Sequence, residues 1–133
     1  MPKKQIQTDK APGAIGPYSQ AVKVGKWVFT AGQIPIEPAS GNIVSGHIKE
    51  KTKQVMENIK AILEASGAKM DDVVKCTIYL TNLQDFTAVN EVYGEYFNPP
   101  YPARSTVQAA ALPKGVNVEI DAIAYIGNEK KVE

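Results

Sequence analysis

Two charged side chains stand in otherwise apolar, strand-like segments of this 133-residue chain, and both could do chemistry. Arg104 opens a segment, residues 104–111, in which no other residue is charged, so its planar guanidinium could hold a carboxylate with two hydrogen bonds. Glu119 lies between Val118 and Ile120, where burial would raise the pKa of its carboxyl and suit it to proton transfer. A structural ion pair for Arg104 and a solvent-facing charge at Glu119 are the alternative interpretations.

Three further residues could complete a ligand site around these charges. Tyr18 follows the rigid pair Gly16-Pro17, so its phenol could orient a ligand, or it could be a core aromatic with its hydroxyl at the surface. Gly32 interrupts a strand-like run, which is typical of a bulge or of a close approach between backbone and ligand. Asn90 shares the apolar stripe of a predicted helix, so its amide needs a partner, either a ligand or another backbone group.

The remaining reactive residue types give weaker signals. Cys76 alternates with apolar residues, so a buried structural thiol is favoured over a nucleophile. His47 stands near a predicted helix start without a catalytic partner, and Asp71-Asp72 is more typical of a turn or cap than of a metal site. Because the chain has one cysteine and one histidine, an intramolecular disulfide and a zinc site of Cys and His ligands are excluded, and we expect no metal.

Composition and charge exclude several classes of protein. Hydrophobic residues make up 44% of the chain and charged residues 22%, which is typical of a folded globular protein and not of a disordered one. The formal net charge of +1 lacks the positive excess of a dedicated nucleic-acid binder. No apolar run approaches the roughly 20 residues of a membrane span, and the start does not resemble a secretory signal. We therefore expect a single cytoplasmic domain over residues 1–133.

The elements that position the candidate residues follow from periodicity and turn signals. Residues 1–17 are expected to form an irregular lead-in, and the charged tail 128–133 is expected to fray. Strands are predicted over residues 18–24, 27–33, 74–80, 104–111 and 116–125, with a hairpin turn at Gly25-Lys26. Helices are predicted over residues 47–66, ended by Gly67, and over residues 83–97, ended by Pro99-Pro100.

The resulting order, ββαβαββ, predicts an α+β fold in which two helices cover one face of a mixed sheet. If residues 112–115 form the turn between the last two strands, those strands run antiparallel, which would place Glu119 a few residues along from Arg104. The other face of the last strand carries Ile123 and Tyr125 beside carboxylates, where no helix is left to cover it. We therefore expect another subunit to cover this face.

Seven segments, in this order along the chain, make it resemble a known family. They are GPYSQA, AGQIP, NIKAILEASG, VNEVYGEYF, PARS, LPKG and VEIDAIA, at residues 16–21, 31–35, 58–67, 89–97, 102–105, 112–115 and 118–124. They resemble the reactive intermediate/imine deaminase family, also called the YjgF or Rid family, over nearly the whole chain. The presence of both Arg104 and Glu119 looks like the deaminase branch, the RidA-like one.

The resemblance implies a homotrimer of chorismate-mutase-like fold, with helices outside, sheets facing a central barrel and ligand clefts between subunits. It implies cofactor-free hydrolysis of enamine/imine intermediates, such as 2-aminoacrylate, 2-iminopropanoate and 2-iminobutanoate, to 2-keto acids and ammonia. Pyridoxal-phosphate dehydratases release these intermediates. By position, Arg104 would bind the substrate carboxylate and Glu119 would orient water or shuttle protons. Tyr18, the third catalytic candidate, would come from an adjacent subunit and line the cleft with Gly32 and Asn90.

One position departs from the family pattern and two other functions stay open. Many members carry cysteine at the position of Thr106, so a covalent thiol mechanism is disfavoured, and any binding role there falls to the backbone or hydroxyl of Thr106. A keto-acid-binding or chaperone-like trimer without turnover is the first alternative. An RNA-directed ribonuclease or translation inhibitor is the second, and the charge balance and the lack of a histidine acid–base pair argue against it.

Overall fold

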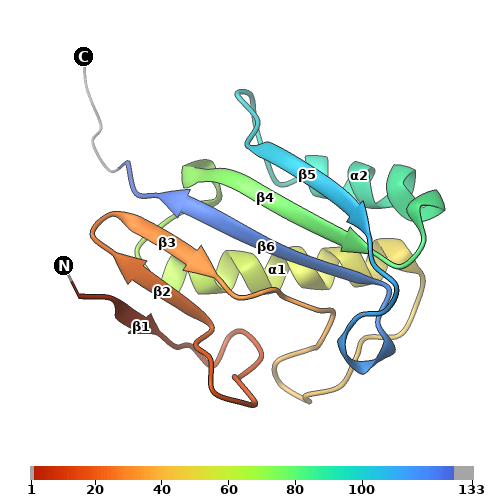
Figure 1. The fold of residues 1–133 in the computed structure, drawn as a ribbon, viewed down its shortest axis with the longest axis horizontal. Helices are drawn as coiled ribbons and strands as arrows, with labels where there is room; N and C mark the ends of the chain where they lie inside the picture. The colour runs from red at the N-terminus through yellow and green to blue at the C-terminus, as the bar shows by residue number, and fades with distance from the viewer. Residues whose placement is uncertain (1, 128–133) are drawn as a thin grey trace.

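The computed structural model describes residues 2–127, which form a six-stranded mixed sheet with two helices (Figure 1). The strand order in the sheet is β1-β2-β3-β6-β4-β5, and only the β4–β5 pair is parallel. The strands are β1 (Lys4–Ile6), β2 (Ala21–Val24), β3 (Trp27–Thr30), β4 (Val73–Leu80), β5 (Ala103–Gln108) and β6 (Val118–Tyr125). The helices are α1 (Ile48–Ala65) and α2 (Phe86–Gly94). Within residues 2–127 we find no helix that could cross a membrane.

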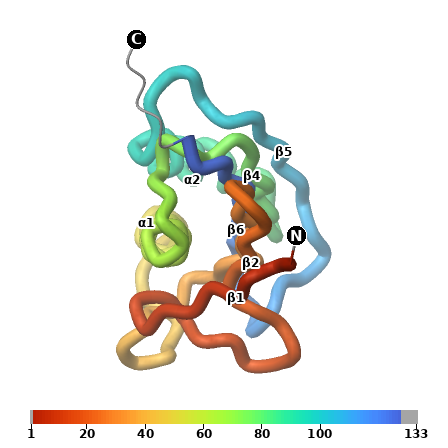
Figure 2. The backbone as a smooth tube through the Cα atoms, turned by 90° about the vertical axis from the view of Figure 1, so that its left-hand side faces the viewer, coloured from red at the N-terminus to blue at the C-terminus, as the bar shows by residue number. Residues whose placement is uncertain are grey.

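Both helices lie on one side of the sheet, as the sequence predicts (Figure 2). Helix α1 buries an apolar stripe completely, namely Val55, Met56, Ile59, Ile62 and Leu63. The Glu50 side chain accepts a hydrogen bond from the His47 backbone N–H at 2.9 Å, and Gly67 follows the helix with a φ of +89°. Each buried stripe residue stabilises the fold by about 1.5–3 kcal/mol, so this helix is held mainly by packing.

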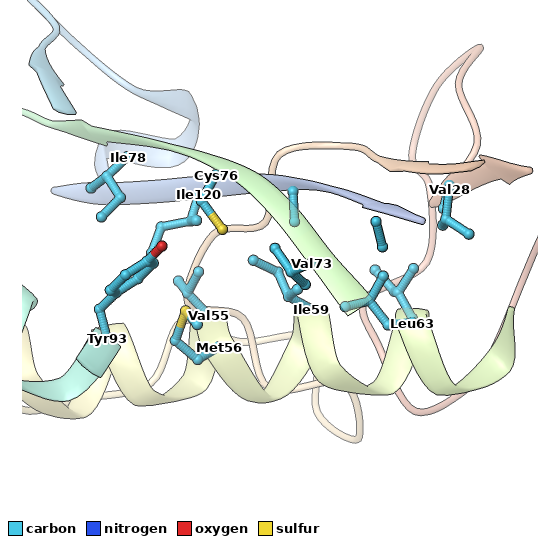
Figure 3. Close-up of a cluster of buried hydrophobic side chains, with 14 of the residues drawn as sticks. Val28, Val55, Met56, Ile59, Leu63, Val73, Cys76, Ile78, Tyr93 and Ile120 are labelled. Carbon is cyan, nitrogen blue, oxygen red and sulfur yellow. The ribbon is translucent and has the colours of Figure 1, made fainter. Parts of the chain in front are cut away.

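The core lies between α1, α2 and the two longest strands, β4 and β6 (Figure 3). Alternate residues of β6 face the helices and are fully buried, from Val118 to Ala124. On β4, Cys76 and Ile78 face the same core, and Cys76 is a free, buried thiol. The interpretation of Cys76 as a structural thiol is therefore confirmed.

The predicted pairing of the last two strands is wrong. β6 lies between β3 and β4, and β5 pairs in parallel with the far edge of β4. The turn at residues 112–115 exists, with a 3.1 Å hydrogen bond from the Gly115 N–H to the Leu112 carbonyl, but it belongs to a longer connection that passes β4. The physical reason is burial: β6 carries a fully buried face and gains from two neighbours, whereas every β5 side chain is partly or fully exposed.

Several predicted boundaries also need correction. The lead-in is not wholly irregular, because β1 pairs with β2, so the chain has six strands instead of five. The second strand is shorter than predicted, because residues 18–20 lie outside it, and the third ends at Thr30. The second predicted helix is a short 3-10 turn at Leu83–Asp85 followed by α2. The expectation of a frayed tail concerns residues 128–133, which lie outside the described residues.

The sheet face opposite the helices is open in the single chain. Trp27 and Phe29 of β3 and Tyr125 of β6 lie on it, and each is exposed by about two-fifths of its surface. The Trp27 and Tyr125 rings meet edge to face, with centroids 4.9 Å apart. An exposed aromatic cluster on a sheet is typical of a surface that another protein covers.

Candidate active site

A cavity of about 640 Å³ opens beside the start of β6, and it brings together three of the candidate residues. Tyr18, Gly32 and Glu119 all line it. Its walls are the loop around residues 12–18, the segment from residues 31 to 41, and the turn that carries Pro113 and Lys114. Tyr18 is half-exposed and is not a core aromatic; its hydroxyl accepts a long, 3.4 Å hydrogen bond from the Ile15 backbone N–H.

The Glu119 side chain lies directly against Gly32. A Cβ atom at position 32 would overlap Glu119 Oε2 and would stand 2.9 Å from Cδ, so only glycine leaves room for the carboxyl in this position. Hydrogen bonds of 2.8 and 3.1 Å between the backbones of Gln33 and Ile120 hold the two segments together. The structure shows a close approach at Gly32, but the group that approaches is a side chain of the same protein, so the predicted approach of this backbone to a ligand stays a prediction.

The environment of Glu119 changes its acidity. Burial raises the pKa of the Glu119 carboxyl, and the nearby charge of Asp121 raises it further. A carboxyl with a raised pKa holds its proton closer to neutral pH, where it can donate that proton during a reaction. Glu119 is only partly buried in the single chain, so it is neither a core residue nor a freely solvated charge.

Two buried amides hold the cavity walls. The Gln20 side chain accepts a hydrogen bond from the Thr8 N–H at 2.7 Å and donates to the Pro12 carbonyl at 2.8 Å. The Asn58 side chain donates to the carbonyls of Ile34 and Ile36 at 3.2 and 3.0 Å. Sequence reasoning missed both residues, although a polar residue inside the buried stripe of α1 was a readable signal for Asn58.

Arg104 lies in a separate cluster, between β5 and α2. Its Nη1 donates a 2.6 Å hydrogen bond to Asn90 Oδ1. Its guanidinium carbon lies 4.9 Å from the centre of the Tyr93 ring and 5.2 Å from that of Phe86. Thr106 lies two residues further along β5, on the same side of the strand.

This arrangement answers two alternatives left by the sequence. Arg104 hydrogen-bonds an amide, and within residues 2–127 the structure shows no ion pair for it, so the alternative of a structural ion pair is not supported there. Asn90 is satisfied by a side chain, and neither a ligand nor a backbone group is needed to explain its place on α2. Cation–π contacts with two aromatic rings and one hydrogen bond hold the guanidinium in place and leave most of its N–H groups for a ligand.

Arg104 and Glu119 do not meet within one chain, contrary to the expectation from the predicted hairpin. Strand β4 separates their strands, and Arg104 pairs with Cys76 while Glu119 pairs with Tyr79. Arg104 points to the helix side of the sheet, and Glu119 points to the open side. We call the cavity with Tyr18, Gly32 and Glu119 the glutamate half-site. The cluster of Arg104, Asn90, Phe86, Tyr93 and Thr106 is the arginine half-site.

The weaker candidates have structural roles. Burial raises the pKa of the Cys76 thiol to about 11, so it is a poor nucleophile at neutral pH. His47 caps α1, and Asp72 accepts hydrogen bonds from the backbone N–H groups of Lys69 and Gly127. Among residues 2–127, no group of three or more His, Cys, Asp and Glu side chains could hold a metal ion.

The family model described as Endoribonuclease L-PSP matches residues 8–126. The chain belongs to the Rid/YjgF/L-PSP family. Within this family, it is 49% identical over 125 residues to the human 2-iminobutanoate/2-iminopropanoate deaminase, covering 94% of this chain and 91% of the human one.

Solved structures of the Rid family share the fold closely. The crystal structure of RidA from an Antarctic Psychrobacter species is 53% identical, with a TM-score of 0.89, and covers 92% of this chain and 99% of its own. The crystal structure of TdcF from Escherichia coli with bound serine is 47% identical, with a TM-score of 0.87, and covers 92% of this chain and 98% of its own. The six-stranded sheet with two helices described above is therefore the Rid fold.

Proposed function

We propose that this protein hydrolyses 2-imino acids to 2-keto acids and ammonia, with 2-iminopropanoate and 2-iminobutanoate as substrates. The observation that carries the proposal is the pair of half-sites: a fixed, stacked guanidinium suited to a carboxylate, and a cavity with a carboxyl whose raised pKa suits proton transfer. The near 50% identity to a human protein named for this reaction supports it.

The complete site forms between two copies of the chain in a homotrimer. Arg104 and Glu119 face opposite sides of the sheet, so one copy must supply the arginine half-site and its neighbour the glutamate half-site. The open aromatic face around Trp27 supports this assembly, because a neighbouring copy would cover it. Tyr18 then reaches the substrate from the subunit that supplies Glu119.

The arginine half-site binds the substrate. The guanidinium of Arg104 donates two N–H groups to the carboxylate of the imino acid, while Asn90 occupies a third and the rings of Phe86 and Tyr93 hold the plane. Fixing the carboxylate also fixes the neighbouring imine carbon, which lowers the entropic cost of the attack by water. Thr106 contributes its hydroxyl or backbone to the same wall.

The glutamate half-site moves the protons. Glu119 begins protonated and gives its proton to the imine nitrogen; for 2-aminoacrylate the proton goes to the terminal carbon and gives the same iminium ion. The Glu119 carboxylate then takes a proton from the water that adds to the imine carbon and passes it to the nitrogen. The C–N bond breaks, ammonia leaves, and the hydroxyl proton returns to Glu119 as the keto group forms. Such acid–base work contributes about 10²–10⁴-fold.

The substrates come from a defined chemical source. Pyridoxal-phosphate dehydratases acting on serine or threonine release enamines, and these are the molecules that the two half-sites fit. The imine carbon is already electrophilic, so water assisted by one carboxyl is a sufficient nucleophile.

A direct rate assay tests the activity. A serine dehydratase generates 2-aminoacrylate, and the loss of the imine is followed with and without this protein. We expect acceleration by the wild-type chain and little by Arg104→Ala; no acceleration, or the same acceleration with Arg104→Ala, refutes the proposal.

Mixing two inactive variants tests the shared site. In trimers reassembled from equal amounts of Arg104→Ala and Glu119→Gln chains, half of the chains carry an intact arginine half-site and the other half carry an intact glutamate half-site. Random pairing between subunits therefore gives about one quarter of the sites both intact half-sites. Activity should therefore return to about that fraction of the wild-type value. If each variant is inactive alone and the mixture stays inactive although mixed trimers form, the site is not shared between copies.

Binding without turnover is the second candidate, because a related structure of TdcF holds serine. The arginine half-site would bind the carboxylate of an amino or keto acid equally well, so a ligand-sensing trimer has the same geometry. Saturable binding of pyruvate without any acceleration in the dehydratase assay would favour this candidate.

A further inference from the structure

Glu119 has a second carboxyl behind it on the same strand. Asp121 lies two residues along β6, so both side chains point to the open face while Ile120 between them is fully buried. Asp121 does not line the cavity. It stands next to the catalytic carboxyl but away from the reacting atoms.

A tyrosine on the neighbouring strand lies opposite one of the two carboxyl residues and hydrogen-bonds the other. Tyr79 of β4 pairs with Glu119 across the ladder, and Thr77 pairs with Asp121. The Tyr79 hydroxyl reaches diagonally and donates a 3.2 Å hydrogen bond to Asp121 Oδ2. This bond favours the charged form of Asp121, since a carboxylate accepts a hydrogen bond better than a neutral carboxyl.

We propose that Asp121 is a positioning residue for the reaction: held as an anion by Tyr79, it keeps the proton on Glu119 until the imine takes it. The argument is electrostatic, because two like charges on the same strand face disfavour ionisation of both carboxyls at once. The assignment rests on the proposed imine deamination for its catalytic meaning, whereas the coupling of the two carboxyls is a property of the protein alone.

The charges around the pair agree with this division of roles. The pKa of Asp121 is also raised, mainly by burial, but the Tyr79 hydrogen bond, the charge of Lys75 and the backbone of Thr77 each offset part of that rise. For Glu119, burial and the Asp121 charge both raise the pKa. The titratable groups that face the pair come from three other segments of the chain: Tyr79 and Lys75 on β4, Tyr18 in the loop and Lys114 in the turn.

A carboxyl titration by ¹³C NMR tests the coupling without any turnover. The protein is labelled at the side-chain carboxyl carbons of Glu and Asp, and Glu119→Gln and Asp121→Asn assign the two signals. In Asp121→Asn, the Glu119 midpoint should fall by about 0.4–1.7 pH units, as expected for like charges roughly 7 Å apart with an effective dielectric constant between that of water and that of a protein surface. In Tyr79→Phe, the lower of the two titration steps should move to higher pH.

Asp71→Asn is the matched control, because Asp71 is exposed and its substitution removes the same charge far from the pair. It should leave the Glu119 midpoint unchanged. If Asp121→Asn changes the trimer in sedimentation, the wild-type protein alone decides: coupling requires the Glu119 titration curve to be broader than that of one independent carboxyl, because the Glu119 signal also responds while Asp121 titrates. A Glu119 curve with the width of one independent carboxyl, or an equal shift in Asp71→Asn, overturns the proposal.

The pH profile of kcat/KM then connects the coupling to catalysis. Because Glu119 must start protonated, activity falls as pH rises through its pKa, and in Asp121→Asn this high-pH limb should move down by the same amount as the NMR midpoint. If Asp121→Asn shifts the midpoint of the Glu119 NMR titration but leaves the high-pH limb of kcat/KM where it is, the catalytic assignment of Asp121 is overturned. Absence of activity in the wild-type protein refutes the proposed function instead and leaves the NMR result standing.

Discussion

Replacing Gly32 by alanine should displace the Glu119 carboxyl from the cavity without greatly changing the stability of the fold. The new Cβ would overlap Glu119 Oε2 and crowd Cδ at 2.9 Å and Cγ at 3.1 Å, so one of the two groups has to move. All three crowded atoms belong to the flexible end of one side chain, and the φ of Gly32 is not in the left-handed region. We therefore expect the Glu119 carboxyl to rotate away while the backbone stays in place.

The expected effects on stability and on rate differ greatly in size. Rotating one partly exposed side chain costs about 0.5–1.5 kcal/mol, so the midpoint of urea unfolding should change little. Removing the carboxyl from the cavity should forfeit most of its acid–base contribution, about 10²-fold or more in kcat. Since Arg104 is on the other half-site, KM should change much less than kcat.

A double-mutant cycle measures whether Gly32 acts through Glu119. Rates are taken in the dehydratase-coupled assay for Gly32→Ala, for Glu119→Gln and for the double variant. If alanine acts only by displacing the carboxyl, the double variant should be no slower than Glu119→Gln alone. Gly94→Ala is the matched control, because nothing lies within 4 Å of a Cβ at that position. The reasoning would be refuted if Gly32→Ala kept the wild-type kcat. It would also be refuted if the loss of kcat in the double variant equalled the product of the losses in the two single variants.

Three other substitutions probe the rest of the site. Arg104→Lys keeps the charge but loses the planar, stacked fork, so KM for the imine should rise about 10- to 100-fold while the urea midpoint stays the same. Asn58→Ala removes the hydrogen bond to the buried Ile36 carbonyl, whereas the Ile34 carbonyl keeps the one from the Ile36 N–H, so the free energy of unfolding should fall by about 1–3 kcal/mol; exposed Asn98→Ala should not lower it. Because the folded protein raises the pKa of Glu119, its ionisation destabilises the fold as pH rises, so Glu119→Gln should be more stable than wild type at pH 8 and lose that advantage at pH 4.

The sequence predicted the elements whose signals are local. The apolar stripe of α1 and the alternation along β6 come from contacts with a single core, so periodicity alone located both. The three residues of β1 are too few to show alternation, and their pairing with β2 depends on the Gln20 side chain that holds the intervening loop. Gly32 was readable as a close approach, but its partner Glu119 is almost ninety positions away in the chain.

The wrong pairing of β5 with β6 has the same physical origin. Turn residues such as Leu112 to Gly115 specify that the chain reverses, but they do not specify which strand edges form hydrogen bonds afterwards. Whether β6 pairs with β5 or lies between β3 and β4 depends on how much surface it buries against the strands on both of its edges. Those strands are far apart in the sequence, so no short segment determines the pairing. The same reasoning shows why the amide partner of Arg104 was not foreseen: Asn90 lies on a helix that β5 reaches only through the parallel pairing with β4.

That pairing also decides where catalysis can occur. Between Arg104 and Glu119 lie one intervening strand and three positions along β4, roughly 10 Å in each direction, and their side chains leave the sheet on opposite faces. No rotamer change can bring the two groups onto one three-carbon imino acid. Under the proposed function, the separation has a consequence for the cell: a folded but unassembled chain binds carboxylates or carries protons but cannot hydrolyse an imine, so the reaction begins only where two copies meet.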